Sequence, residues 1–115
     1  MLRGEIRLVD FGQALGGESA YRRPAVIVSN EGANTVAARL GRGVLTVVPI
    51  TSNVSRIYPF QVLVTAEESG LDRDSKVQAE QVRSVSLERI GSALGSVPAP
   101  LMLQVDEALR LHLSL

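Results

Sequence analysis

A chain of 115 residues with 45% apolar side chains has enough material for one hydrophobic core, and we expect residues 1–115 to form a single domain. The absence of cysteine excludes disulfides and thiolate metal sites. No apolar run reaches the ~18 residues of a membrane span, and the N-terminal residues do not resemble a signal peptide. We therefore expect a cytoplasmic protein with no membrane partner.

The charges of the chain balance overall but are unevenly placed. There are 12 basic and 12 acidic residues, yet the stretch from Arg22 to Phe60 holds five arginines and one glutamate, a net charge of +4. A neutral protein of this kind can present one positive face to a polyanion. All but one of the basic residues are arginine, which suits bidentate phosphate contacts, although a GC-rich genome gives the same bias.

Short strands separated by polar loops are predicted for the first half of the chain. Loose alternation and short runs of β-branched residues indicate the strands, while glycine and small polar residues indicate the loops. In chain order the predicted elements are a strand at 5–11, a loop at 12–22, a buried strand at 25–29, a helical turn or irregular loop at 30–39, a strand at 44–50 and a polar turn at 51–59.

The second half continues with strands and ends in a helix. A strand is predicted at 60–65, a polar loop at 67–74, a segment with spaced apolar residues at 77–85 and a last strand at 92–97. The apolar face of the helix at 101–115 is wider than the ~100° typical of a surface helix, so we expect it to contact more than the core. Five or six strands and one terminal helix predict a mainly β fold, a small β-barrel with a C-terminal helix packed on it.

The residue sets of the commoner enzymes are absent. The chain has no cysteine nucleophile, and its single histidine, His112, lies on the apolar face of the predicted helix. We interpret His112 as a buried or interface residue. Asp72 and Asp74 flank an arginine and lack the glycine and glutamate of a calcium loop, so we interpret them as part of a solvated loop. No metal site and no cofactor are expected.

Polar clusters lie at the ends of three predicted strands. Arg22-Arg23-Pro24 opens one strand, residues 49–53 (Pro-Ile-Thr-Ser-Asn) close another, and Tyr58-Pro59-Phe60 opens a third. Each cluster taken alone is ordinary turn chemistry. Their occurrence together, in one order, is more informative than any one of them.

That order resembles the MazF/PemK family of bacterial toxin ribonucleases, over nearly the whole chain. The segments that carry the resemblance are Gly4-Glu5-Ile6 with Val9-Asp10, then Gly16 and Glu18 leading to Arg23-Pro24-Ala25-Val26-Ile27-Val28-Ser29, then Val47-Val48-Pro49-Ile50-Thr51-Ser52, then Tyr58-Pro59-Phe60-Gln61-Val62, and finally Ala79-Glu80-Gln81-Val82-Arg83-Ser84-Val85.

The resemblance implies an SH3-like barrel that forms a homodimer. It implies the toxin component of a type II toxin–antitoxin system, an endoribonuclease that cuts single-stranded RNA at selected sequences. It also implies a cognate antitoxin whose extended tail occupies the RNA groove. In the family the catalytic pair is the arginine of Arg-Pro-Ala-Val and the threonine after Val-Pro-x, which here are Arg23 and Thr51.

These residue types suit RNA cleavage by the 2′-hydroxyl group, which leaves a 2′,3′-cyclic phosphate and a 5′-hydroxyl. The substrate supplies the nucleophile, so the protein needs mainly to stabilise charge on the phosphorane. Arg23 can provide that charge and Thr51 can donate a hydrogen bond. A guanidinium is a poor base, so we assign Glu18 a supporting role and leave the general base unassigned.

RNA contacts are predicted from the polar loops. Tyr21 and Tyr58 can stack on bases, whereas Phe11 and Phe60 are interpreted as core residues. Many members have a serine at the position of Gly17, and Ser19 can substitute for its contact. Many also have a tryptophan on the first strand, which this chain lacks. The remaining predicted RNA-binding residues are Arg22, Arg56 and Arg83 for phosphates, Asn53 and Gln81 for base edges, and Ser52 beside the catalytic threonine.

Two alternative functions stay open at this point. Toxins of the same fold bind DNA gyrase without cutting nucleic acid, a function that would depend on the terminal helix. An SH3-like interaction module without catalysis is the second alternative. Arg23 and Thr51, each within its family motif, favour the ribonuclease.

Overall fold

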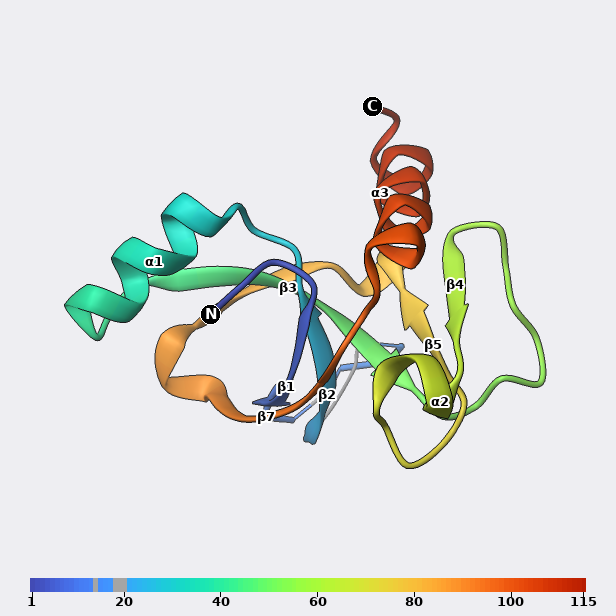
Figure 1. Cartoon of the computed structure of the whole chain (residues 1–115), viewed down its shortest axis with the longest axis horizontal. Helices are drawn as coiled ribbons and strands as arrows, with labels where there is room; N and C mark the ends of the chain where they lie inside the picture. Colours follow the sequence, from blue (N-terminus) through green and yellow to red (C-terminus); the bar gives the residue numbers. More distant parts are fainter. Residues whose placement is uncertain (14, 18–20) are drawn as a thin grey trace.

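The computed structural model describes residues 1–13, 15–17 and 21–115, and within them seven antiparallel strands form one sheet in the order β4-β5-β3-β2-β1-β7, with β6 paired to β3 (Figure 1). The mainly β fold class with a C-terminal helix is therefore confirmed. The strands are β1 (Glu5–Asp10), β2 (Arg22–Ile27), β3 (Val44–Thr51), β4 (Gln61–Val64), β5 (Ser75–Gln78), β6 (Arg83–Ser86) and β7 (Ile90–Ser96).

Strands β2 and β3 lie at the centre of the fold and have buried residues on both faces. This explains why their sequences are continuous apolar runs rather than alternating ones. Val26 and Val48 belong to a core cluster that includes Met102 and Val105 of the C-terminal helix. Their neighbours Ala25 and Val47, with side chains on the opposite face, belong to a second cluster on the other side of the sheet.

Strand β2 begins earlier than predicted because its first residues pair with β1. Asp10 is the partner of Arg22, and Val9 is the partner of Arg23. The polar Arg22-Arg23-Pro24 cluster is thus part of the strand and not of the loop before it. The strand predicted at 92–97 also begins earlier, at Ile90.

The segment at 30–39, for which a helical turn and an irregular loop were both considered, is the helix α1 (Glu31–Leu40). The Asn30 side chain accepts a hydrogen bond from the Ala33 amide at the N-terminus, and Gly41 ends the helix in the left-handed conformation that glycine favours. The predicted polar loop at 67–74 overlaps the short helix α2 (Ala66–Ser69), which Thr65 and Glu68 begin with a capping box. Two 3₁₀ turns, η1 (Ala79–Gln81) and η2 (Leu87–Arg89), flank β6.

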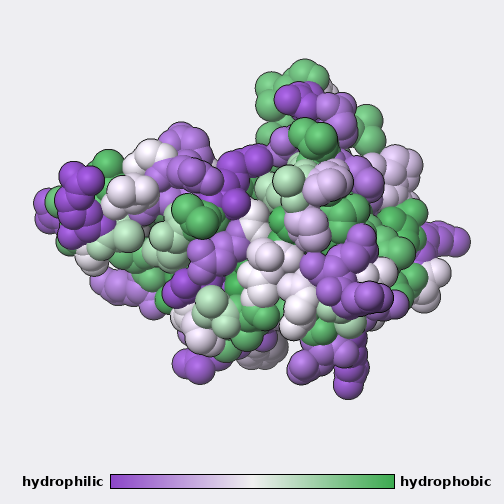
Figure 2. Space-filling view, in the orientation of Figure 1, coloured by the Kyte–Doolittle hydropathy of each residue, from purple (hydrophilic) through white to green (hydrophobic). Residues whose placement is uncertain are grey.

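The C-terminal helix α3 (Ala99–Leu113) packs on the sheet with its first turns and extends beyond it with its last (Figure 1). His112 lies in the extending part and is exposed, so it is not buried within the chain, and an interface role for it stays a prediction. The reason is that the sheet does not reach the end of the apolar face. Figure 2 shows apolar residues gathered at this end of the molecule, where Leu111, Leu113 and Leu115 are exposed. No helix in the described part of the chain is long and apolar enough to cross a membrane.

Candidate functional site

The cavity at the centre of the site lies where β2 and β3 stop pairing. The last pair of partners between these strands is Ala25 and Pro49. Pro24 and Pro49 have no amide hydrogen to donate to a ladder, which favours the end of pairing at this position. On its opposite edge the end of β3 pairs with β5, where Thr51 is the partner of Lys76. Residues of both strands at this position, among them Arg23 and Thr51, line the cavity.

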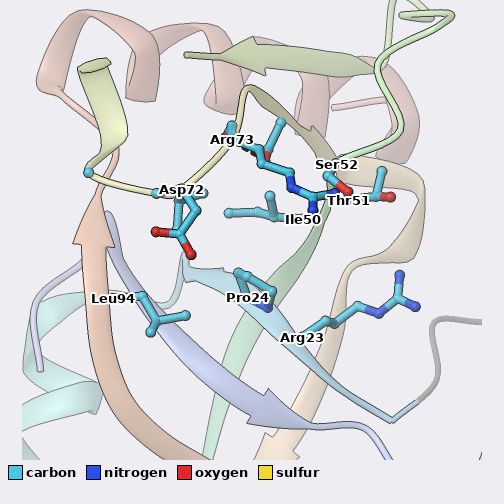
Figure 3. Close-up of a pocket in the computed structure, with 11 residues that line it drawn as sticks. Arg23, Pro24, Ile50, Thr51, Ser52, Asp72, Arg73 and Leu94 are labelled. Atoms are coloured by element: carbon cyan, nitrogen blue, oxygen red, sulfur yellow. Dashed lines mark hydrogen bonds between the residues drawn. The ribbon is translucent and has the colours of Figure 1, made fainter. Parts of the chain in front are cut away.

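This cavity has a volume of about 530 Å³ and brings the predicted catalytic pair together (Figure 3). Arg23 comes from β2 and Thr51 from the end of β3, and both are half-buried. A second wall is formed by the loop between α2 and β5, and Leu94 of β7 also lines the cavity. The lining residues are Arg23, Pro24, Ile50, Thr51, Ser52, Gly70, Leu71, Asp72, Arg73, Ser75 and Leu94.

The Thr51 hydroxyl is oriented by its own chain. Its oxygen accepts a hydrogen bond from the Asn53 amide at 3.3 Å. This contact uses a lone pair and not the hydroxyl proton, so Thr51 can still donate a hydrogen bond to a ligand in the cavity. Arg23 contributes the positive charge of its guanidinium group. A cation and a hydroxyl donor on neighbouring strands are suited to bind an anion such as a phosphate.

A second group of predicted residues lies on the loop that follows β3. Arg56 donates a hydrogen bond to the Tyr58 hydroxyl at 3.2 Å, and its guanidinium carbon lies 5.6 Å from the Tyr58 ring centre. The Tyr58 and Phe60 rings are stacked, with centres 5.4 Å apart. Phe60 is half-buried, and Tyr58 keeps 42% of its surface exposed. The group thus presents a preformed arginine and an aromatic ring at the surface.

The other predicted RNA-binding residues lie outside the cavity lining. Tyr21 and Arg22 are exposed at the start of β2, and Tyr21 has a φ angle of 61°. Gln81 donates to the Gly17 carbonyl at 2.8 Å, and the Arg83 guanidinium lies 5.5 Å from the Phe11 ring centre. The Asn53 side chain accepts hydrogen bonds from the Ser55 amide and hydroxyl. Glu18 and Ser19 lie outside the described residues.

Sequence reasoning missed the second wall of the cavity. Asp72 and Arg73 are exposed, as predicted for a solvated loop, but the loop borders the cavity. A tertiary contact brings it there: α2 packs against β7 where Gly95 lies, and a side chain on Gly95 would overlap the Ser69 carbonyl oxygen. No local motif signals this contact. Among the residues that the structure describes, no group of three or more His, Asp or Glu side chains is arranged to hold a metal ion.

Comparison with protein families finds one match over nearly the whole chain. The model described as "PemK-like, MazF-like toxin of type II toxin-antitoxin system" matches residues 2–113. Endoribonuclease MazF9 of Mycobacterium tuberculosis is 56% identical over 115 residues, which are 100% of this chain and 98% of that protein. Endoribonuclease EndoA of Bacillus subtilis is 27% identical over 98% of this chain and 94% of its own length.

Solved structures show the same fold. The crystal structure of MazF from Deinococcus radiodurans superposes with a TM-score of 0.82 at 28% identity, covering 100% of this chain and 97% of that one. A crystal structure of MazE–MazF from the same organism superposes with a TM-score of 0.74 at 26% identity, covering 100% of this chain and 97% of that one.

Proposed function

We propose that this chain is an endoribonuclease that cuts single-stranded RNA at selected sequences. The proposal starts from the family to which the chain belongs, the PemK-like, MazF-like toxins of type II toxin–antitoxin systems. The observation that carries the proposal is the shared cavity of Arg23 and Thr51, the two residues that match the family's catalytic motifs. The proposed cleavage uses no metal ion, because the RNA supplies the nucleophile and Arg23 supplies the charge that stabilises the phosphorane.

The reaction begins with the RNA 2′-hydroxyl group. Its oxygen attacks the neighbouring phosphorus as the 2′ proton leaves, and the bond to the 5′-oxygen breaks as that oxygen gains a proton. The products are a 2′,3′-cyclic phosphate and a 5′-hydroxyl. Arg23 binds the phosphate oxygens on which negative charge accumulates, usually the largest contribution to such catalysis. Thr51 donates its hydroxyl proton as a hydrogen bond to the same group. We also propose a supporting role for Glu18 in the reaction.

The RNA path is proposed to run from the cavity across the loop after β3. Ser52 would contact the nucleotide at the cavity, while Arg56 and Tyr58 would hold the next phosphate and base. Proteins usually bind single-stranded RNA with cations that contact the phosphates and aromatic rings that stack on the bases. The further RNA contacts proposed are Ser19, Tyr21, Arg22, Asn53, Gln81 and Arg83.

A homodimer and a cognate antitoxin are the proposed protein partners. The related MazF of Deinococcus radiodurans has been solved together with MazE, and by analogy the antitoxin of this chain would cover the RNA groove. The exposed leucines at the end of α3 supply apolar surface for a second copy. Sedimentation at micromolar protein concentration should give the mass of a dimer, and the mass of a monomer would contradict the proposed homodimer. We also propose that the protein is located in the cytoplasm.

Cleavage of single-stranded RNA in excess EDTA, with analysis of the new ends, tests the proposal. We expect selected cuts that leave 5′-hydroxyl ends, abolished by Arg23→Ala and slowed about 100-fold or more by Thr51→Ala. The matched controls are Arg39→Ala and Thr35→Ala, which alter exposed positions on α1 and should cut normally. RNA left intact by the wild-type chain would contradict the proposal and favour the gyrase-binding or interaction-module alternatives.

A further inference from the structure

The loop between α2 and β5 carries a second cation to the cavity. Arg73 lines the cavity together with Arg23 and Thr51 but belongs to none of the sequence motifs that identify the catalytic pair. Figure 3 shows its side chain running from the loop toward Thr51 and Ser52, whereas Arg23 approaches from β2. Two guanidinium groups therefore border the same space from two different walls.

The backbone that carries Arg73 is held in place at several points. The Asp74 carboxylate accepts a hydrogen bond from the Ala66 amide at 2.8 Å, which ties the end of the loop to the start of α2. The Ser69 hydroxyl accepts from the Leu71 amide at 3.1 Å. The Ser75 hydroxyl donates to the Arg73 carbonyl itself at 3.1 Å. A loop fixed at its first and last residues presents its arginine at a defined position.

The Arg73 side chain itself has no partner within the described residues. The structure shows neither a hydrogen bond from its guanidinium group nor an ion pair with a carboxylate of the described part of the chain. Asp72 is its neighbour and also lines the cavity, but Figure 3 shows the Asp72 carboxylate directed toward the Leu94 side. The Arg73 charge is therefore not neutralised by that carboxylate.

We propose that Arg73 is a further catalytic residue, whose guanidinium group binds the scissile phosphate and shares the charge of the phosphorane with Arg23. This inference rests on the proposed ribonuclease function. The pentacoordinate phosphorane carries more negative charge than the ground-state phosphodiester, so a second cation at the same phosphate lowers the barrier more than it strengthens ground-state binding. Arg73 acts only through its charge and its hydrogen bonds to the phosphate, and takes no part in proton transfer.

The test compares Arg73→Gln and Arg73→Lys with the wild type under single-turnover conditions. The substrate is a single-stranded RNA that contains one mapped cleavage site, kept in EDTA. We expect Arg73→Gln to lower the maximal rate constant about 100-fold and Arg73→Lys to lower it less. The half-saturating protein concentration should change only about threefold, because Arg73 contributes mainly to transition-state binding. Arg39→Gln removes the same charge from α1 and should cut as the wild type does.

Binding is measured separately with the same RNA carrying a 2′-deoxy nucleotide at the cleavage site, which cannot be cut. Its affinity for Arg73→Gln should match the wild-type affinity within about threefold. A Gln variant that cuts at the wild-type rate would overturn the inference, as would a variant with a normal maximal rate and weakened binding. If the wild type cuts and Arg23→Ala does not, such a result leaves the proposed function standing; a wild-type chain that cuts no RNA removes both.

Discussion

Thr51 and Lys76 are directly opposed partners across β3 and β5, and Lys76 also fixes the loop that follows Thr51. Its ammonium group donates a hydrogen bond to the Arg56 carbonyl at 2.7 Å and lies 5.9 Å from the Tyr58 ring centre. Lys76 is the only lysine of the chain, and just 8% of it is exposed. One buried cation thus connects the strand end that carries Thr51 with the loop proposed to bind RNA.

Replacing this cation should loosen the loop. In Lys76→Met the Arg56 carbonyl loses its donor, so we expect the free energy of unfolding to fall by about 1–2 kcal/mol in urea denaturation. RNA binding should weaken more than the maximal cleavage rate changes, because Arg56 and Tyr58 are displaced while Arg23 stays in place. Arg42→Met removes an exposed cation and serves as the control. Unchanged stability and unchanged affinity would contradict this role of Lys76.

Gly95 allows α2 to approach β7, and through this contact it positions the second wall of the cavity. A Cβ atom at Gly95 would overlap the Ser69 carbonyl oxygen, which is backbone and cannot rotate away. We expect Gly95→Ala to destabilise the fold by roughly 1–3 kcal/mol and to slow RNA cleavage, since Arg73 follows α2. At Gly17 a Cβ atom meets nothing within 4 Å. Gly17→Ala should therefore keep the wild-type melting temperature and serves as the control. Equal melting temperatures for the wild type, Gly95→Ala and Gly17→Ala would argue against the contact between Gly95 and Ser69.

Tyr21 adopts a left-handed backbone conformation that is unfavourable for a tyrosine. Its φ angle is 61°, its amide donates to the Gly12 carbonyl at 2.5 Å, and 68% of the residue is exposed. Such a conformation costs on the order of 1–2 kcal/mol for a residue other than glycine. Tyr21→Gly should therefore fold with at least wild-type stability despite losing the ring. Tyr21→Val should be about 1 kcal/mol or more less stable than Tyr21→Gly in the same denaturation assay. A Tyr21→Val protein that is more stable than Tyr21→Gly would contradict the backbone strain at this position.

Glu5 gives the fold a dependence on pH. A hydrogen bond from the Leu2 amide, then one from Arg7, holds the pKa of the Glu5 carboxyl below its ordinary value of 4.5. A lowered folded-state pKa adds stability above pH 4.5, and this contribution is lost as pH falls through the folded-state pKa. The stability difference between wild type and Glu5→Gln should therefore be larger at pH 7 than at pH 3. A difference that does not change with pH would contradict the assignment.

Much of the fold can be predicted from the sequence because periodicity reports burial. The strands with apolar runs, β2 and β3, are found within a few residues of their predicted bounds. The terminal helix is likewise predicted from the spacing of its apolar residues. The short helix α2 was missed because it has only four residues, three of them polar, and is stabilised by a capping box rather than by an apolar face. The exposure of His112 could not be predicted, because it depends on where the sheet ends beneath α3.

The site was only partly predictable for a related reason. Arg23 and Thr51 lie at the ends of neighbouring strands, and family motifs identify both. Arg73 reaches the same cavity through the contact between Gly95 and Ser69, residues that are distant in sequence and carry no motif. The role of Lys76 depends likewise on the register of β3 with β5. Local pattern predicts what a segment forms, but not which distant loop packs beside it.

The most direct measurement is the single-turnover cleavage rate constant of four proteins: wild type, Arg23→Ala, Thr51→Ala and the double variant. The same RNA is used in EDTA throughout. If both side chains act on one phosphate in one cavity, each single change should slow cleavage about 100-fold or more, and the double variant should lose less than the product of the two effects. An Arg23→Ala protein that cuts at the wild-type rate would contradict the account.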